Sequence, residues 1–231
     1  MSAARRRALL SWSSGKDSAW TLHVLRTRHP EVELVGLLTT VNVTHERVAM
    51  HAVRRRLLRL QAAAAGLPVR EVEIPSPCTN EQYEQAMGAA VEAALADGVD
   101  TMAFGDLFLE DIRAYREEKL AGTGLEPVFP LWGTPTDELA DEMLAAGLAA
   151  TITCVDPKQV SRELCGRDWD AELIAALPDS ADPCGENGEF HTFVHAGPMF
   201  SAPVPITRGE VVERDGFVFA DLAPAAAESP R

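Results

Sequence analysis

The first stretch of this sequence that could do chemistry is SSGKDS, at residues 13–18, which directly follows an apolar run. The pattern predicts a strand over residues 8–12 and a helix over residues 17–29, with a turn between them. Such a turn presents free backbone N–H groups at a helix N-terminus, where an anion is stabilised. Its glycine permits close backbone approach, and its lysine adds a compact positive charge. The stretch therefore predicts a phosphate loop formed by Ser13, Ser14, Gly15, Lys16, Asp17 and Ser18.

An ordinary βα turn with a serine cap is the alternative interpretation of this stretch. A Walker loop is excluded, because that motif needs a glycine five positions before Gly15, where this chain has Leu10. The order S-S-G-K-D-S is instead similar to the S-G-G-K-D-S signature of the PP-loop ATP pyrophosphatases, which cleave ATP between its α- and β-phosphates. Ser14 stands where the signature has glycine, a departure that matters if this position needs a positive φ angle.

A second polar stretch follows a predicted strand over residues 101–104 and begins with Gly105 and Asp106. A glycine at a strand exit lets a ligand approach the backbone, and the carboxylate of Asp106 could position Mg²⁺ through water or accept a ribose hydroxyl. The helix that follows carries acids and arginines at the spacings of a salt-bridged surface helix. For Arg113 a surface role and a site role both remain open, whereas Arg116 is expected on the surface.

A third stretch, DPCGENGEFHTF at residues 182–193, places two carboxylates and an imidazole among glycines. Strand alternation would put Glu189 and His191 on one face and Thr192 on the other. A carboxylate beside an imidazole can bind an amine or move a proton, so we expect Glu186, Glu189 and His191 to face a substrate. A glycine-rich turn followed by a strand with a polar outer face is the alternative.

The elements around these stretches predict an α/β fold. A continuous apolar run at residues 33–41 predicts a buried strand, the alternating residues 69–74 predict another strand, and helices of 10 to 20 residues lie between the strands. Gly66 is expected to end one helix and Asn80 to cap the next. The alternation implies right-handed crossovers and a Rossmann-like parallel sheet with helices on both faces. Residues 13–18, 39–42 and 105–106 would then meet at the carboxyl edge of the sheet, where ligands bind.

Beyond residue 120 the pattern changes. A helix is predicted over residues 136–147, a strand over 150–155, a short helix over 170–177, and a hairpin over 206–222 that turns at Asp215 and Gly216. These elements suggest a smaller α/β domain that faces the substrate. We therefore expect an ATP-binding domain over residues 1–128, a substrate-facing domain over 129–222, and a tail over 223–231.

Composition narrows the possible partners. The 231 residues carry a formal net charge of −14, which disfavours general nucleic-acid binding. A local cluster of Arg54, Arg55, Arg56 and Arg59 is best explained as a solvated helix face. No apolar run is long enough for a membrane span and no signal peptide is apparent, so a cytoplasmic protein is expected. The four cysteines lie far apart and suggest neither a metal site nor a disulfide framework, although a reactive thiol at Cys78 or Cys184 remains open.

Together, SSGKDS, FGDLFLEDIRAYRE and DPCGENGEFHTF resemble the diphthine-ammonia ligase-like family of PP-loop ATP pyrophosphatases, over nearly the whole chain. The resemblance implies an adenine nucleotide α-hydrolase-type fold that uses ATP and Mg²⁺. It also implies a ligase: a substrate carboxylate attacks the α-phosphate, pyrophosphate leaves, and ammonia displaces AMP to give an amide. A homo-oligomer is possible, and the identity of the carboxylate substrate stays open.

The same resemblance assigns roles to individual residues. Residues 13–18 would bind phosphates, with Asp17 holding magnesium, and Gly105 and Asp106 would line the nucleotide crevice. Thr40 and His51 would lie near the adenosine. The implied catalytic set is Lys16, Asp17, Glu186, Glu189 and His191.

One departure from the family concerns the substrate region. Members from organisms that make diphthamide commonly read E-G-G-E-F/Y-E-T, whereas this chain has His191 in place of the last acid. Two other functions share parts of the pattern. A tRNA-modifying PP-loop enzyme has the same loop, but it is disfavoured by the acidic charge. A non-catalytic nucleotide sensor of the universal-stress type would carry a late glycine-rich phosphate motif, which this chain lacks.

Overall fold

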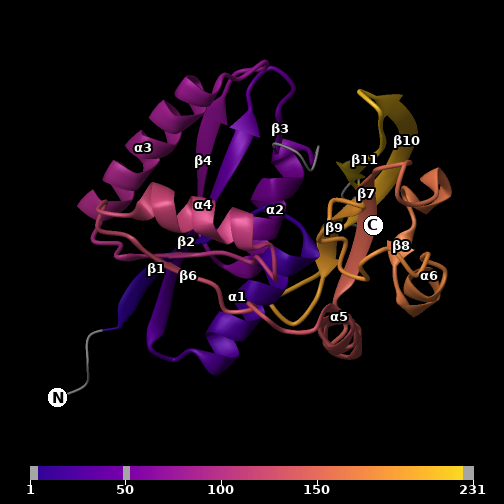
Figure 1. The fold of residues 1–231 in the computed structure, drawn as a ribbon, viewed down its shortest axis with the longest axis horizontal. Coiled ribbons are helices and arrows are strands. Elements are labelled where there is room, and N and C mark those ends of the chain that lie inside the picture. The colour runs from indigo at the N-terminus through magenta and orange to yellow at the C-terminus, as the bar shows by residue number, and fades with distance from the viewer. Residues whose placement is uncertain (1–4, 49–52, 226–231) are drawn as a thin grey trace, which may run out of the picture.

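The computed structural model describes residues 5–48 and 53–225, which form two sheets, one in each half of the chain (Figure 1). The predicted adenosine contact His51 and most of the predicted tail lie outside the described residues. Parallel strands flanked by helices build the first half, as the sequence predicts. The fold is α/β and consistent with a Rossmann-like adenine nucleotide α-hydrolase fold.

The first sheet has six strands in the order β3-β2-β1-β5-β6, with β4 also paired to β2. All its pairings are parallel except that of β2 with β3. Its strands are β1 (Arg6–Ser11), β2 (Val32–Asn42), β3 (Arg47–Val48), β4 (Val69–Ile74), β5 (Thr101–Ala103) and β6 (Glu126–Val128). The sequence pattern misses β6 because the strand is short and contains a proline, which a strand at the edge of a sheet tolerates.

Alternation along β1 decides which helices cover each face of this sheet. Leu9 and Leu10 are both fully buried, yet they belong to separate apolar clusters. Leu10 packs with residues of the first two helices, and Leu9 packs with residues of the third, because successive strand residues point to opposite faces. The helices are α1 (Lys16–Arg28), α2 (Arg55–Ala65), α3 (Asn80–Ala96) and α4 (Glu110–Leu120). Helices therefore cover both faces.

The ends of α2 and α3 test two sequence predictions. Gly66 follows α2 with φ 67°, the left-handed conformation expected of a helix-ending glycine. The prediction that Asn80 caps α3 is wrong by one residue. Asn80 is the first residue of the helix, and Thr79 is its N-cap. The Thr79 hydroxyl accepts from the backbone N–H of Gln82 at 3.2 Å, and the Gln82 side chain accepts from the Thr79 N–H at 3.0 Å. This reciprocal capping box satisfies two donors at once.

The second half forms an antiparallel five-stranded sheet in the order β10-β11-β7-β8, with β9 also paired to β7. Its strands are β7 (Ala149–Val155), β8 (Asp168–Trp169), β9 (Phe190–Ala196), β10 (Ile206–Arg214) and β11 (Phe217–Pro224). The helices are α5 (Thr136–Ala145), α6 (Ala171–Ala175) and the 3₁₀ turn η1 (Arg162–Leu164). The predicted hairpin is confirmed, with Asp215 and Gly216 both at positive φ in its turn.

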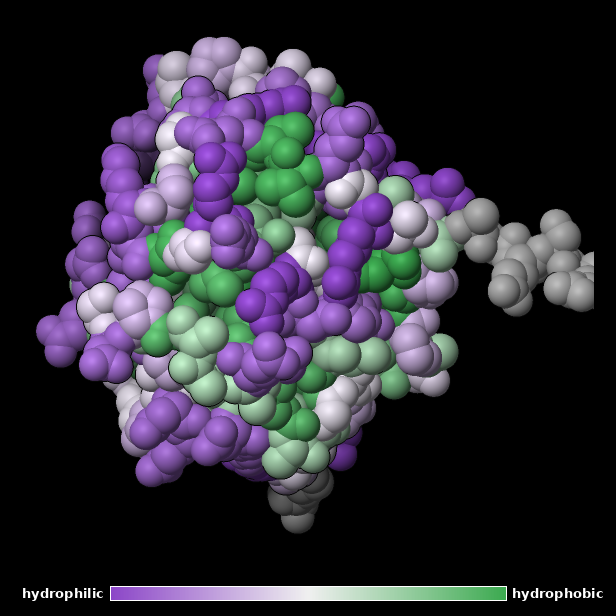
Figure 2. Space-filling view, turned by 90° about the vertical axis from the view of Figure 1, so that its right-hand side faces the viewer, coloured by the Kyte–Doolittle hydropathy of each residue, from purple (hydrophilic) through white to green (hydrophobic). Residues whose placement is uncertain are grey.

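One apolar cluster joins the two halves, since it contains Leu22 and Leu57 from the first half and Ile152 and Phe193 from the second. The outer side of the second half mixes hydrophobic patches with hydrophilic side chains (Figure 2). The shared core brings β9 next to the start of α1. That contact determines the geometry of the site.

Candidate active site

The phosphate loop, residues 13–18, comprises the turn after β1 and the first residues of α1, and its own serines hold it. The Ser13 hydroxyl accepts from the Gly15 N–H at 3.2 Å and lies 3.1 Å from the hydroxyl of Ser18. The Ser18 hydroxyl donates to the Gly15 carbonyl at 3.0 Å. Ser14 adopts φ 73°, and its buried hydroxyl has no hydrogen-bond partner within the described residues. The position at which the signature carries glycine therefore does need a positive φ angle.

Strand β9 supports this loop from the other half of the chain. The Lys16 N–H donates to the Thr192 hydroxyl at 3.1 Å, and the Val194 N–H donates to the Ser14 carbonyl at 3.0 Å. These contacts join segments about 180 residues apart, since Lys16 and Thr192 are separated by 176 positions. The conformation of the loop thus depends on both halves.

Lys16 is the buried cation of the site. Its side chain is 2% exposed, and its Nζ donates to both carboxylate oxygens of Asp17, at 2.8 and 2.9 Å, and to the Cys184 carbonyl. Burial alone would lower the pKa of Lys16, but the Asp17 carboxylate outweighs it and the pKa is raised. The ammonium is therefore charged at neutral pH, and it could bind a phosphate oxygen in exchange for one of these partners.

Residues 182–189, which we call the acid loop, are held by their own carboxylates. Asp182 accepts from the Cys184 N–H at 2.8 Å and from the Thr136 hydroxyl at 2.6 Å. Glu189 accepts from the Asp182 N–H at 2.8 Å and from the Asn187 side chain at 3.1 Å. Glu189 is only 1% exposed. Strand alternation predicts that Glu189 faces a substrate. In the structure it lies inside the acid loop and does not line the cavity beside the phosphate loop.

Glu186 and His191 do face the cavity. Glu186 accepts from the Leu107 N–H at 3.0 Å, which joins the acid loop to the first half. Burial, with the nearby Asp17, raises the pKa of Glu186 to about 7. Burial, with the nearby Lys16, lowers the pKa of His191 to about 4, so its imidazole is neutral at pH 7. The two groups are candidates for proton transfer and for hydrogen bonding, respectively.

The polar residues meet in one cavity of about 210 Å³, which we call the phosphate cavity. Of the predicted residues it contains Ser13, Lys16, Asp17, Ser18, Gly105, Asp106, Glu186 and His191. Gly15 precedes α1 as its N-cap, and Ser14 is buried. At Gly105, a Cβ atom would lie 2.9 Å from the Thr21 hydroxyl and 3.0 Å from the Asp17 carbonyl. Only glycine lets this strand exit pack so closely against α1.

Arg116 belongs to the site, although the sequence assigns it to the surface. Its Nε lies 2.6 Å from the Asp106 carboxylate, and its guanidinium lies 4.3 Å from the ring centroid of Phe104. The guanidinium of Arg116 thus balances the negative charge of the Asp106 carboxylate. The aromatic residue directly before Gly105 was the one local sign of a stacked arginine. By contrast, Arg113 stacks on Phe129 and Trp132 and does not line the phosphate cavity.

A second cavity of about 460 Å³, the nucleoside cavity, adjoins the first, because both are lined by Ser11, Ser13 and Arg116. Thr40 lines this cavity, and α3 supplies five further lining residues, Tyr83, Met87, Ala90, Val91 and Ala94. An apolar cavity beside a polar one that contains a buried lysine matches the two parts of a nucleotide.

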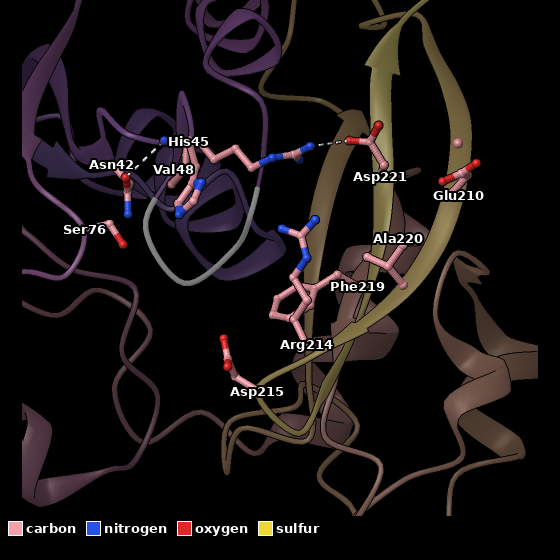
Figure 3. Close-up of a pocket in the computed structure, with 13 residues that line it drawn as sticks. Asn42, His45, Val48, Ser76, Glu210, Arg214, Asp215, Phe219, Ala220 and Asp221 are labelled. Atoms are coloured by element: carbon pink, nitrogen blue, oxygen red, sulfur yellow. Dashed lines mark hydrogen bonds and ion pairs between the residues drawn. The ribbon is translucent and has the colours of Figure 1, made fainter.

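A third and larger cavity, about 950 Å³, lies where the turn after β2 faces the hairpin β10–β11 (Figure 3). Asp221 closes one side by accepting from Arg47 at 2.9 Å and from Arg54 at 2.6 Å. Arg55 and Arg59 pair with Glu71. Arg54, Arg55 and Arg59 are therefore ion-paired at the surface and do not form a free basic patch, the alternative that the sequence disfavours.

The thiols and the candidate metal ligands complete the site. Burial raises the pKa of Cys184 to about 12, so it is not a reactive thiolate. Among the described residues, no group of three His, Cys, Asp or Glu side chains could hold a metal ion. A magnesium ion carried by nucleotide phosphates needs only one or two carboxylates, and the partly exposed Asp17 fits that need.

Within the described part of the chain, no helix has the length and apolarity to cross a membrane.

Comparison with known proteins gives two family matches. The diphthamide synthase N-terminal domain matches residues 6–126, and the diphthamide synthase C-terminal domain matches residues 135–220. The diphthine–ammonia ligase of Danio rerio is 26% identical over 235 residues, covering 91% of this chain and 90% of that protein. The human diphthine–ammonia ligase is 25% identical over 244 residues, covering 91% and 86%. The corresponding ligase of Schizosaccharomyces pombe is 25% identical over 218 residues, which cover 87% of this chain and 36% of that protein.

Proposed function

The chain belongs to the diphthamide synthase family, and from this premise we propose that it is an ATP-dependent ligase that converts a substrate carboxylate to an amide with ammonia. One observation carries the proposal: Lys16 of the phosphate loop donates to the Cys184 carbonyl of the acid loop, and both loops line the phosphate cavity. A nucleotide phosphate and an acceptor carboxylate would therefore meet in the same place.

The first step that we propose is adenylation. An oxygen of the substrate carboxylate attacks the α-phosphorus of ATP, and the bond to the β-phosphate oxygen breaks, which releases pyrophosphate. The carboxylate needs this activation because its own oxygen is a poor leaving group, whereas AMP is a good one. Lys16 and the N–H groups at the start of α1 would stabilise the phosphate charge. The nucleoside cavity would hold the adenosine, with Thr40 in its wall.

The second step is amide formation. Ammonia attacks the carbonyl carbon of the acyl-adenylate, the bond to AMP breaks, and one proton must leave the nitrogen. Glu186 lines the cavity and has a pKa of about 7, so its ionised form can accept that proton near neutral pH. The neutral His191 would accept a hydrogen bond from the ammonia and orient it. His191 occupies the position at which relatives commonly carry an acid, so the acceptor need not be diphthine.

Magnesium fits this scheme as a partner of the nucleotide. Asp17 would hold it together with the ATP phosphates, and the ion would neutralise the departing pyrophosphate. Arg116 would stay paired with Asp106 at the junction of the two cavities, where its stacked guanidinium can face the sugar or the α-phosphate.

The test is product analysis. The protein is incubated with ATP, Mg²⁺, ammonia and pooled small carboxylates, and the nucleotide products are separated. Formation of AMP and pyrophosphate that depends on a carboxylate supports the proposal. Release of ADP and phosphate would contradict it. Tight ATP binding with no turnover under any condition would instead favour a nucleotide sensor.

A further inference from the structure

Gln61 of α2 is a fully buried amide that contacts three separate parts of the site. Its Nε2 donates to the Ser14 carbonyl at 3.1 Å and to the Val194 carbonyl at 2.6 Å. Its Oε1 accepts from the indole N–H of Trp12 at 3.1 Å. The residue is 0% exposed, and it lies 47 positions from Ser14 and 133 from Val194. We infer that Gln61 is a positioning residue, which fixes the phosphate loop relative to the nucleoside cavity and strand β9.

The first contact supports the strained point of the loop. Ser14 has φ 73°, a conformation that costs a non-glycine residue free energy unless the surroundings hold it. Its carbonyl accepts two hydrogen bonds, one from Gln61 and one from the Val194 N–H. The Gln61 amide therefore helps to hold the turn that aims the next N–H groups towards the phosphate cavity.

The second contact fixes a wall of the nucleoside cavity. Trp12 lines that cavity and is 2% exposed. Packing holds this buried indole, and the hydrogen bond to Gln61 fixes the direction of its N–H. The position of the ring and the position of the phosphate loop are thereby set by one side chain.

The third contact joins the phosphate loop and the Trp12 ring to the second half of the chain, because the Val194 carbonyl belongs to β9. A neutral primary amide is suited to this task, since it offers two donors and one acceptor without introducing charge. Glutamate lacks the donors when ionised, and methionine lacks the donors and has only a weak acceptor. Without the Gln61 donors the Ser14 carbonyl keeps only its bond from the Val194 N–H, and the free energy of each lost hydrogen bond is forfeited.

This inference rests on the proposed ATP site, and it is tested by binding together with NMR. The variant is Gln61→Met, which keeps the length of the side chain and removes its donors. We expect Mg-ATP to bind about tenfold more weakly. In the ligand-free protein, the indole N–H resonance of Trp12 should move upfield, and the backbone amide resonances of Gly15 and Lys16 should shift.

Leu58→Ala is the matched control, because Leu58 is a fully buried residue of the same helix that lies in the apolar core. It should lower the melting temperature while ATP affinity stays within about twofold of wild type and the Trp12 resonance stays in place. If Gln61→Met does not fold, Gln61→Asn replaces it, since that amide is one methylene too short to reach all three partners.

The outcomes separate the two proposals. Unchanged ATP affinity in a folded Gln61→Met protein would overturn the inference, and so would an equal loss of affinity in Leu58→Ala. A wild-type protein that does not bind ATP would overturn the proposed function. In that case the resonances of Trp12, Gly15 and Lys16 still decide whether Gln61 positions the loop.

Discussion

The Nζ of Lys16 donates to the main-chain carbonyl of Cys184, so the phosphate loop is bonded to the acid loop 168 positions further along the chain. The same ammonium holds both oxygens of Asp17. All three of its donors are therefore in use. A phosphate oxygen that binds Lys16 must take the place of one of these partners, which couples nucleotide binding to the arrangement of the acid loop.

Lys16→Ala should weaken ATP binding by about tenfold to a hundredfold, because a buried charged hydrogen-bond donor is lost. The Asp17 carboxylate would also lose its cation, and the acid loop its bond at Cys184. Isothermal titration with Mg-ATP measures the effect. Lys158→Ala, on an exposed turn, is the control and should bind like wild type. Wild-type affinity in Lys16→Ala would remove this lysine from the phosphate site.

Ser14→Gly should stabilise the protein by about 1 kcal/mol, even though glycine adds flexibility to the unfolded chain. The reason is that Ser14 combines φ 73° with a buried, unpartnered hydroxyl. Ser14→Ala removes the hydroxyl but keeps the strain, so its melting temperature should lie between those of wild type and Ser14→Gly. Urea and thermal unfolding of the three proteins give the order. A less stable Ser14→Gly would mean that the serine hydroxyl has a partner in solution.

Glu189 should prove to be a structural residue. Glu189→Gln keeps the oxygen that accepts from Asp182 and Asn187, so turnover should stay near that of wild type. Glu189→Ala removes that acceptor and should lower the free energy of unfolding by about 1–3 kcal/mol, with a parallel loss of turnover. A folded Glu189→Gln protein without turnover would instead support the substrate-facing role that strand alternation predicts.

Sequence patterns predicted local secondary structure and missed contacts between segments that are distant in the sequence. The strand, loop and helix at residues 6–28 follow from an apolar run that ends in small polar residues, and the helix-ending role of Gly66 follows from its type. The inward position of Glu189 could not be predicted from the sequence, because alternation along β9 gives no information on how the preceding acid loop folds over it. The pairing of Arg116 with Asp106 could not be predicted either, since by spacing an arginine among acids on a helix has several equally good partners.

Glu186 should give the stability of the protein a distinctive pH dependence. Its pKa is raised from 4.5 in the unfolded chain to about 7, mainly by burial. Between these values the folded state binds the proton more tightly, so the contribution of Glu186 to stability is fully present below pH 4.5. It is lost as the pH rises towards 7 and does not change further above it.

The low pKa of His191, about 4, acts in the opposite direction between pH 4 and 6.5, so the effect of Glu186 is isolated by difference. Wild type and Glu186→Gln are unfolded in urea at half-unit steps from pH 5 to 8. The difference in unfolding free energy should shift in favour of Glu186→Gln as the pH rises to 7 and then level off. Turnover of the wild type should rise over the same range, because the ionised carboxylate is the proposed proton acceptor. A difference that does not change with pH would mean that Glu186 titrates like an exposed glutamate, and it could not then serve as the base near neutral pH.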